Sequence, residues 1–448
     1  MAVNEELVDA IDTLWKIPAP GPENIYSDPT FITLMGVCSE RYGLPKNPFG
    51  LSFALGNALR SLGAPCLQSS TAPGGRPTMR GVADKLDHAF TRKTVNRRYL
   101  CPLDCADSLP ALAFGNATVR QFTAIELEEL FDERRLMRNF QGWRLDSAKL
   151  SEFSWLVVEE EFQVDKPLGA GVTQFCYQRV DRDLGEIDPH QSRFPRPVEE
   201  ALFFLMLGNW ESWSSMNEVD WRGFRVRWVY TLDDDLFIAP SKPPSADSLS
   251  WQPYIYDSGW GEVVEEERPI VYELTHNANN EMQRLDNNYW QQLVDARATP
   301  LFETPVEHFL VRAFLSDGID EFMAHLTVID AAFGLHKDYD KKNRPKDDPL
   351  REAGATKRVA TRLAAALNEP RATEAYNELF NLRSAFIHGR SEVDKISMEK
   401  RVLARSLARK AAEALVSLSS SPDPSRESVL RTLLVCGTGI QSSAGISE

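Results

Sequence analysis

The stretch that decides the fold of the C-terminal third is LFNLRSAFIHG, residues 379–389. Its apolar residues recur at helical spacing, and its last residue is a glycine, which commonly follows the end of a helix. The pattern predicts a helix whose inward face carries Ala375, Leu379, Leu382 and Phe386.

Helical spacing also dominates the sequence on both sides of this stretch. Further helices are predicted over residues 306–314, 322–333, 359–367, 396–418 and 429–435, with a charged loop over residues 337–348. No strand pattern interrupts them. We therefore expect residues 301–436 to form an all-α, up-and-down helical bundle, followed by a flexible tail over residues 437–448.

Arg383 and His388 lie five residues apart near the end of the predicted helix. Arginine makes planar, bidentate contacts with phosphate, and histidine transfers protons near neutral pH. Arg383 is the only arginine of the chain with a histidine five to seven residues downstream. The pair is a candidate site with a structural alternative, in which the histidine bonds helix carbonyls and the arginine pairs with Glu378 or Asp330.

The order of motifs around this pair resembles the Apea-like branch of the HEPN superfamily. The resemblance rests on RAFL at 312–315, LTVIDAAFG at 326–334, KRVA at 357–360 and R-S-x-x-I-H-G at 383–389. It covers about residues 305–436, which is less than a third of the chain.

The resemblance implies a HEPN-like bundle that dimerises, so that two copies of an R-x4-6-H motif face each other across a cleft. Such a composite site is a metal-independent endoribonuclease, with Arg383 and His388 as its catalytic residues. Ser384 fits the polar position after the arginine, and Asp330 stands where family members more often have glutamate. Phe380 stands where many members have tyrosine, so a hydroxyl is absent at that position.

The chemistry of RNA cleavage agrees with a composite site. The ribose 2′-OH supplies the nucleophile, so a site needs a base, an acid and positive charge at the phosphate. One chain offers one histidine here, and a dimer offers two. Five residues along a helix rotate by about 140° and rise about 7.5 Å, so Arg383 and His388 do not share a helix face. A basic rim for RNA is predicted from Lys337, Lys341, Lys342, Arg344, Lys346 and Arg390.

The N-terminal two-thirds of the chain has a different character. Residues 1–145 are predicted to be mainly helices and loops, and residues 146–300 to be an α+β part, either separate or one domain with the first. Aromatic and β-branched residues predict strands at 155–158, 173–177, 224–230 and 270–274, with a helix over 198–210.

Three features of this region have alternative interpretations. The basic cluster RKTVNRR, residues 92–98, is either an RNA or phosphate contact or a solvated helix face. The three aspartates at 233–235 favour a turn over a cation site, because they stand between two strand-like runs. Cys101 and Cys105 lack the further ligands that a zinc site needs. We expect neither a metal nor a cofactor.

The charge of the chain is unevenly distributed. The net charge is −15, and residues 301–436 carry 21 basic and 20 acidic side chains against 29 and 44 in residues 1–300. We therefore expect RNA to approach the C-terminal bundle. No apolar run is long enough to cross a bilayer, the N-terminus does not look like a signal peptide, and six cysteines make no disulfide framework. These features predict a cytoplasmic protein without a membrane partner.

The main hypothesis from the sequence is a homodimeric, metal-independent endoribonuclease. The resemblance suggests an antiphage or toxin-like defence role, in which residues 1–300 sense a phage or cellular trigger or restrain the bundle. The alternative is a non-catalytic HEPN-like module that only dimerises or binds nucleic acid.

Overall fold

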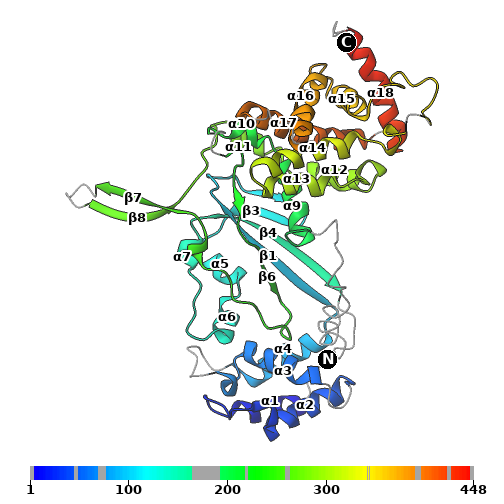
Figure 1. Cartoon of the computed structure of the whole chain (residues 1–448). Helices are drawn as coiled ribbons and strands as arrows, with labels where there is room; N and C mark the ends of the chain where they lie inside the picture. The colour runs from blue at the N-terminus through cyan, green and yellow to red at the C-terminus, as the bar shows by residue number, and fades with distance from the viewer. Residues whose placement is uncertain are drawn as a thin grey trace. The chain divides into compact units, whose positions relative to one another are not determined.

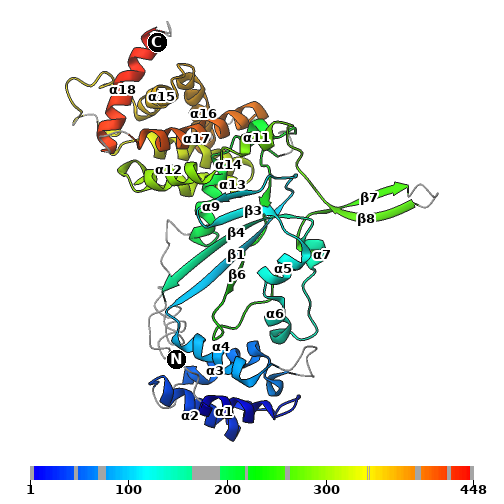
Figure 2. The same cartoon turned by 180° about the vertical axis from the view of Figure 1, so that it is seen from behind.

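The computed structural model describes residues 5–44, 49–68, 77–163, 192–216, 220–257, 263–340, 342, 344–388, 395–420 and 425–443. The chain divides into two compact units, each assembled from three segments. Figures 1 and 2 show the elements of the whole chain, coloured from blue at the N-terminus to red at the C-terminus. The first unit comprises residues 1–101, 121–188 and 228–249, and the second comprises residues 102–120, 189–227 and 250–448. Strand β1 (Thr94–Asp104) begins in the first unit and ends in the second.

The first unit opens with a cluster of four helices, α1 (Glu5–Trp15), α2 (Pro29–Arg41), α3 (Phe49–Leu62) and α4 (Met79–Thr91). They share one apolar core, in which Leu7, Ile11, Phe31, Leu55 and Leu86 have no exposed surface. Side-chain caps define two of the helix starts, because Asp28 accepts the amide of Thr30 at 2.8 Å and Thr78 accepts the amide of Gly81 at 3.2 Å. The remaining helical elements of this unit are η1 (Ile25–Ser27), η2 (Pro65–Leu67), α5 (Ala124–Leu130), α6 (Glu133–Asn139), α7 (Ser147–Leu150) and η3 (Ala246–Ser248).

Strands of the first unit flank β1 on both sides. β4 (Ser154–Gln163) neighbours β1 in the sheet, and β6 (Tyr230–Asp233) pairs with β1 in antiparallel register, with Arg98 opposite Leu232. The basic cluster at 92–98 is therefore not a helix face, because from Thr94 onward its residues belong to β1.

Three antiparallel strand pairings lie in the described part of the second unit. β2 (Leu112–Phe114) pairs with β3 (Ala117–Gln121), and β5 (Arg225–Val226) pairs with β1 so that Leu103 lies opposite Val226. β7 (Trp251–Asp257) and β8 (Val263–Pro269) form a two-stranded sheet of their own.

Helices make up the described chain of the second unit from residue 278 onward. Packing contacts join α13 to α14, α14 to α17, and α15 to both α16 and α18, and these helices lie together in Figure 1. The helical elements of the unit are α9 (Arg196–Met206), α10 (Trp210–Trp213), α11 (Ala278–Met282), α12 (Asn287–Arg297), η4 (Pro300–Phe302), α13 (Val306–Leu315), α14 (Gly318–Phe333), η5 (His336–Asp338), α15 (Ala355–Leu367), α16 (Ala372–Ile387), α17 (Met398–Leu418) and α18 (Arg426–Ser443).

The chain is thus a mixed α and β protein with small antiparallel sheets and a helical C-terminal region, as the sequence predicted at this coarse level. The predicted strand at 155–158 lies within β4, and the predicted helix at 198–210 corresponds to α9 and the start of α10. The predicted strand at 173–177 lies outside the described residues.

Three local predictions were wrong. The run 224–230 is split between β5 and β6, and the run 270–274 makes only isolated bridges, through Tyr272 and Leu274. The predicted tail is helical at its start, because α18 continues to Ser443.

Candidate functional site

Arg383 lies near the C-terminal end of α16 and is paired with α14. Its Nη1 donates a hydrogen bond to Oδ2 of Asp330 at 2.8 Å. The two side chains are 24% and 28% exposed, so the ion pair is neither buried nor fully solvated. The alternative partner Glu378 is instead bound by Lys400. The structure therefore brings the predicted catalytic arginine to the predicted supporting aspartate, although aspartate is shorter than glutamate.

Tyr376 completes this arrangement. Its hydroxyl donates a hydrogen bond to Oδ1 of Asp330, and its side chain has no exposed surface. Tyr376 and Arg383 are seven residues apart on α16, which is close to two turns, so they project from the same helix face. This spacing is a sequence signal that could have found Tyr376, whereas the family resemblance places a tyrosine hydroxyl at position 380. We call Tyr376, Asp330 and Arg383 the Asp330 group.

The electrostatics of the Asp330 group reflect its partial burial. Burial raises the pKa of the Asp330 carboxyl above its ordinary value of 3.8, while the hydrogen bond from Tyr376 and the charge of Arg383 oppose this increase. Burial also raises the pKa of Tyr376 well above 10, so this hydroxyl remains a proton donor. The guanidinium of Arg383 carries five N–H donors, and Asp330 accepts a hydrogen bond from one of them, on Nη1. The group therefore holds a cation in place without using all of its donors.

His388 follows the last residue of α16. Its backbone has φ −90° and ψ 11°, and its amide donates to the carbonyl of Ser384 at 3.0 Å. The His388 side chain is exposed, and Ser384 is partly exposed. Among the described residues, no hydrogen bond or ion pair joins the imidazole of His388 to Arg383 or Asp330. Five residues of helix rotate by about 140°, so the Cα atoms of Arg383 and His388 do not share a helix face.

The end of α16 also exposes apolar surface. Phe386 is 50% exposed and Ile387 is 52% exposed. The prediction that Phe386 faces inward was therefore wrong. The apolar face of α16 is buried at Tyr376 and Leu379, but the last turn of the helix extends beyond this buried part.

The predicted basic rim is only partly exposed. Lys342 and Lys346 are exposed, and Lys337 is exposed but paired with Glu427 at 2.6 Å. Arg344 is 5% exposed, and it donates to the carbonyls of Asp338, Leu350, Arg351 and Ala353. Arg344 therefore does not belong to a solvent-facing rim. Lys341 and Arg390 lie outside the described residues.

Arg344 belongs instead to a buried set of residues that sequence reasoning missed. Asp338 is 2% exposed and accepts hydrogen bonds from Arg358 Nε at 2.6 Å and Arg362 Nη2 at 2.9 Å. Arg358 also binds Asp348 through Nη2 at 2.8 Å. We call Asp338, Asp348, Arg344, Arg358 and Arg362 the Asp338 cluster. It fixes the ends of the predicted charged loop to α15.

The aspartates and cysteines that the sequence offered as candidate metal ligands have other environments. Asp233 is the last residue of β6 and binds Arg97 at 2.5 Å, and the next residue, Asp234, binds Arg92 at 2.7 Å, so ion pairs satisfy these carboxylates. Burial raises the pKa of the Cys101 thiol, which has no exposed surface. Within the described residues, no group of three or more His, Cys, Asp or Glu residues is arranged to hold a metal ion.

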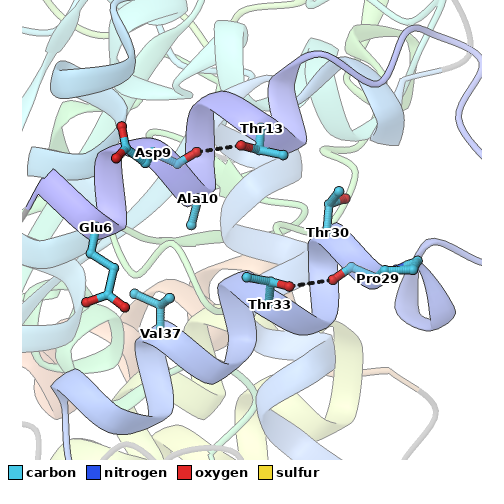
Figure 3. A pocket seen from close by; sticks show the side chains of 8 residues that line it. All are labelled: Glu6, Asp9, Ala10, Thr13, Pro29, Thr30, Thr33 and Val37. Atoms are coloured by element: carbon cyan, nitrogen blue, oxygen red, sulfur yellow. Dashed lines mark hydrogen bonds between the residues drawn. The ribbon is translucent and has the colours of Figure 1, made fainter.

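A pocket of about 380 Å³ lies between α1 and α2 in the first unit (Figure 3). The hydroxyls of Thr13 and Thr33 donate at 2.8 Å to carbonyls of their own helices, those of Asp9 and Pro29. The lining contains two carboxylates and no cationic side chain, so it is unsuited to phosphate. It is formed by Glu6, Asp9, Ala10, Thr13, Pro29, Thr30, Thr33 and Val37.

Comparisons of the chain with protein-family models, with curated proteins and with solved structures found no match. None of the described helices has both the length and the apolar character needed to cross a membrane.

Proposed function

We propose that the chain is a metal-independent endoribonuclease, which cuts RNA by attack of the ribose 2′-OH on the adjacent phosphate. The observation that carries the proposal is the Asp330 group. It holds the Arg383 guanidinium at partial exposure on the helix that ends in the exposed His388. These are the two functions that metal-free RNA cleavage needs, a phosphate-binding cation and a proton-transfer group.

Each residue has a defined role in this proposal. Arg383 binds the scissile phosphate with the Nη donors that Asp330 does not use, because its Nε is buried. Asp330 and Tyr376 position the guanidinium and do not contact RNA. His388 transfers a proton from its exposed position after the last residue of α16.

The proposed site consists of two copies of the chain. Cleavage needs one group to remove the 2′-OH proton and another to protonate the leaving 5′-oxygen, and one chain supplies a single histidine here. A second His388 from a homodimer provides the other group. The half-exposed Phe386 and Ile387 next to His388 support an interface at this end of α16, because a second chain would cover them. The HEPN resemblance leads us to extend the proposal to a defence role regulated by residues 1–300.

One observation favours a second candidate, a non-catalytic HEPN-like module that dimerises or binds nucleic acid. Arg383 is committed to Asp330, and no recorded contact joins it to His388. Such a module would keep the ion pair for helix packing alone.

Cleavage of a labelled single-stranded RNA in EDTA distinguishes the two. The wild-type chain is expected to leave 2′,3′-cyclic phosphate ends, and His388→Ala is expected to lower the rate by at least about 100-fold, the usual contribution of a general acid or base. Arg383→Ala is expected to have a similarly large effect. Matched controls are His336→Ala and Arg431→Ala, which alter an exposed histidine and an exposed arginine of the same unit.

Binding without cleavage by all variants, at protein concentrations where light scattering shows a dimer, would favour the module. Cleavage by a monomer would contradict the composite site.

A further inference from the structure

Tyr339 is an exposed aromatic residue near the Asp330 group. It is 80% exposed, whereas Tyr376 has no exposed surface. Burial is the main cause of the raised pKa of Tyr376, and electrostatic interactions with Asp330 and with Tyr339 add to it. An open ring therefore lies close to the residues that hold Arg383. A single exposed aromatic side chain is ordinary on a protein surface, so its setting decides what it can do.

The backbone that carries Tyr339 is held in place. Tyr339 follows η5, and its amide donates to the carbonyl of His336 at 3.2 Å. The carbonyl of the preceding residue, Asp338, accepts a hydrogen bond from Arg344 at 2.5 Å, and the Asp338 carboxylate is bound within the Asp338 cluster. A ring on an ordered backbone presents its face to a ligand at a small further cost in conformational entropy.

A short connection joins Tyr339 to Asp330. Helix α14 ends at Phe333, and the amide of Gly334 donates to the carbonyl of Asp330 at 2.8 Å. A Cβ atom at Gly334 would lie 2.5 Å from that carbonyl oxygen, so a larger residue would displace the turn. The tight turn fixes the start of the segment that leads from Asp330 to Tyr339.

Phe380 is a second aromatic residue at the site, but it already contacts Arg383. The Arg383 guanidinium lies 5.5 Å from the centre of the Phe380 ring, and the Phe380 and Tyr376 rings lie 6.1 Å apart. These three residues are three and four positions apart on α16, so they share one helix face. Phe380 therefore supports the cation, and Tyr339 is the ring that is open to a ligand.

The loop that begins beside Tyr339 suits a polyanion better than the net charge of the chain suggests. Lys342 and Lys346 are exposed. Three aspartates of the loop are paired with arginines, namely Asp338, Asp347 and Asp348. Positive charge for the backbone and an aromatic face for the bases are the two contacts by which proteins bind single-stranded nucleic acid.

We propose that Tyr339 is the base-stacking residue of the RNA site, so that the site takes a strand with an unpaired base beside the scissile phosphate. The inference rests on the proposed function and adds the contact that selects its substrate. The face of a base can be reached only when the base is unpaired and splayed out from its neighbours. Stacking tolerates any sequence, because every base has a π-face. The site therefore selects unpaired RNA without requiring a particular base.

The test compares two fluorescent strands of about ten nucleotides by anisotropy. One is an oligouridylate, and the other is an abasic ribose–phosphate strand with the same phosphates and 2′-hydroxyls. The full chain carries His388→Ala throughout, so that neither strand is cut. Tyr339→Ala removes the ring, and Tyr339→Phe keeps the ring and removes the hydroxyl. Tyr256→Ala, which alters an exposed tyrosine of β7, is the matched control.

Tyr339→Ala should weaken binding of the oligouridylate at least about fivefold and leave binding of the abasic strand unchanged. Tyr339→Phe and Tyr256→Ala should bind both strands as the parent protein does. Damage to the fold would instead weaken both strands equally. Equal losses on the two strands, an oligouridylate affinity unchanged by Tyr339→Ala, or no binding by the parent protein would each overturn the proposal.

This result is separable from that of the ribonuclease proposal. Arg383→Ala should weaken both strands, because it removes a phosphate contact. If the wild-type chain cuts no RNA but the oligouridylate binds through Tyr339, the ribonuclease fails and the stacking contact is supported. If RNA is cut but Tyr339→Ala binds the oligouridylate normally, the stacking contact alone fails.

Discussion

The Asp338 cluster and the Asp330 group are built from the same residue types in one helical region, but they differ in how completely the protein uses their donors. The Asp338 side chain is 1% exposed, and that of its partner Arg362 is also 1% exposed. Arg362 directs its remaining donors to main-chain carbonyls within the bundle. In the Asp330 group, Arg383 makes one hydrogen bond to the described residues, its Nε is buried without a partner there, and the ion pair is partly open to solvent.

This difference separates structural arginines from candidates for function. An arginine surrounded by protein acceptors can take no further ligand without losing hydrogen bonds that the fold requires. An arginine held at one edge by a carboxylate keeps its orientation and still has donors for a phosphate. Arginine–carboxylate pairing alone is therefore uninformative, and the useful quantity is the share of donors that remains unused.

The largest expected difference between the two lies in the free energy of unfolding. Asp338→Asn leaves two buried guanidinium groups without their shared counter-charge, which should cost about 3–5 kcal/mol. Asp330→Asn alters a partly exposed pair and should cost about 1–2 kcal/mol. Urea unfolding at pH 7, followed by circular dichroism, measures both. Equal losses would show that the Asp330 group is as structural as the Asp338 cluster.

The pH dependence of stability should have opposite signs at the two aspartates. Burial raises the pKa of Asp330 above 3.8, so the folded state binds this proton more tightly, and its contribution to stability falls as the pH rises above that value. Burial also opposes ionisation of Asp338, but Arg362 and Arg358 outweigh it and lower its pKa. That contribution is present above pH 3.8 and is lost as the pH falls through the folded-state pKa.

Unfolding curves of the wild type and the two Asn variants between about pH 2 and 6 would test these signs, because the Asp338 contribution is lost below pH 3.8. The destabilisation by Asp338→Asn should grow as the pH rises toward 3.8 and then level off, and that by Asp330→Asn should shrink as the pH rises above 3.8. Parallel pH profiles for the two variants would contradict the assignment of the two environments.

Local periodicity predicted the helices well, because each helix of the C-terminal region carries its own apolar stripe. Asp330 was one of the two partners that the sequence predicted for Arg383, because it lies on an earlier predicted helix. Tyr376 was missed because its contact with Asp330 joins two helices. The apolar pattern of one helix does not show which other helix it packs against. The Asp338 cluster was missed for the same reason, as Asp338 and Arg362 meet only when α15 packs against the loop.

The β7–β8 hairpin shows a different limit of sequence reasoning. Strand prediction relied on aromatic and β-branched runs, which selected residues 270–274. The strand β8 contains three consecutive glutamates and lacks the composition of a strand buried on one face, whereas β7 carries an aromatic and β-branched signal at Trp251 and residues 254–256 that Pro253 interrupts. Both strands form through pairing with each other, which composition does not reveal.

The smallest expected effect is on RNA binding, and it concerns two basic residues of one loop. Arg344 belongs to the Asp338 cluster, whereas Lys346, two residues later, is exposed. If Lys346 contacts an RNA phosphate, Lys346→Ala should weaken RNA binding severalfold and reduce the slope of log K against log salt by about 0.7, the release expected for one contact with a single strand. Filter binding between about 50 and 200 mM salt measures the slope. Lys16→Ala is a suitable control, because Lys16 is a comparably exposed lysine of the first unit. Identical slopes for both variants would remove Lys346 from the rim and restrict phosphate contacts to the end of α16.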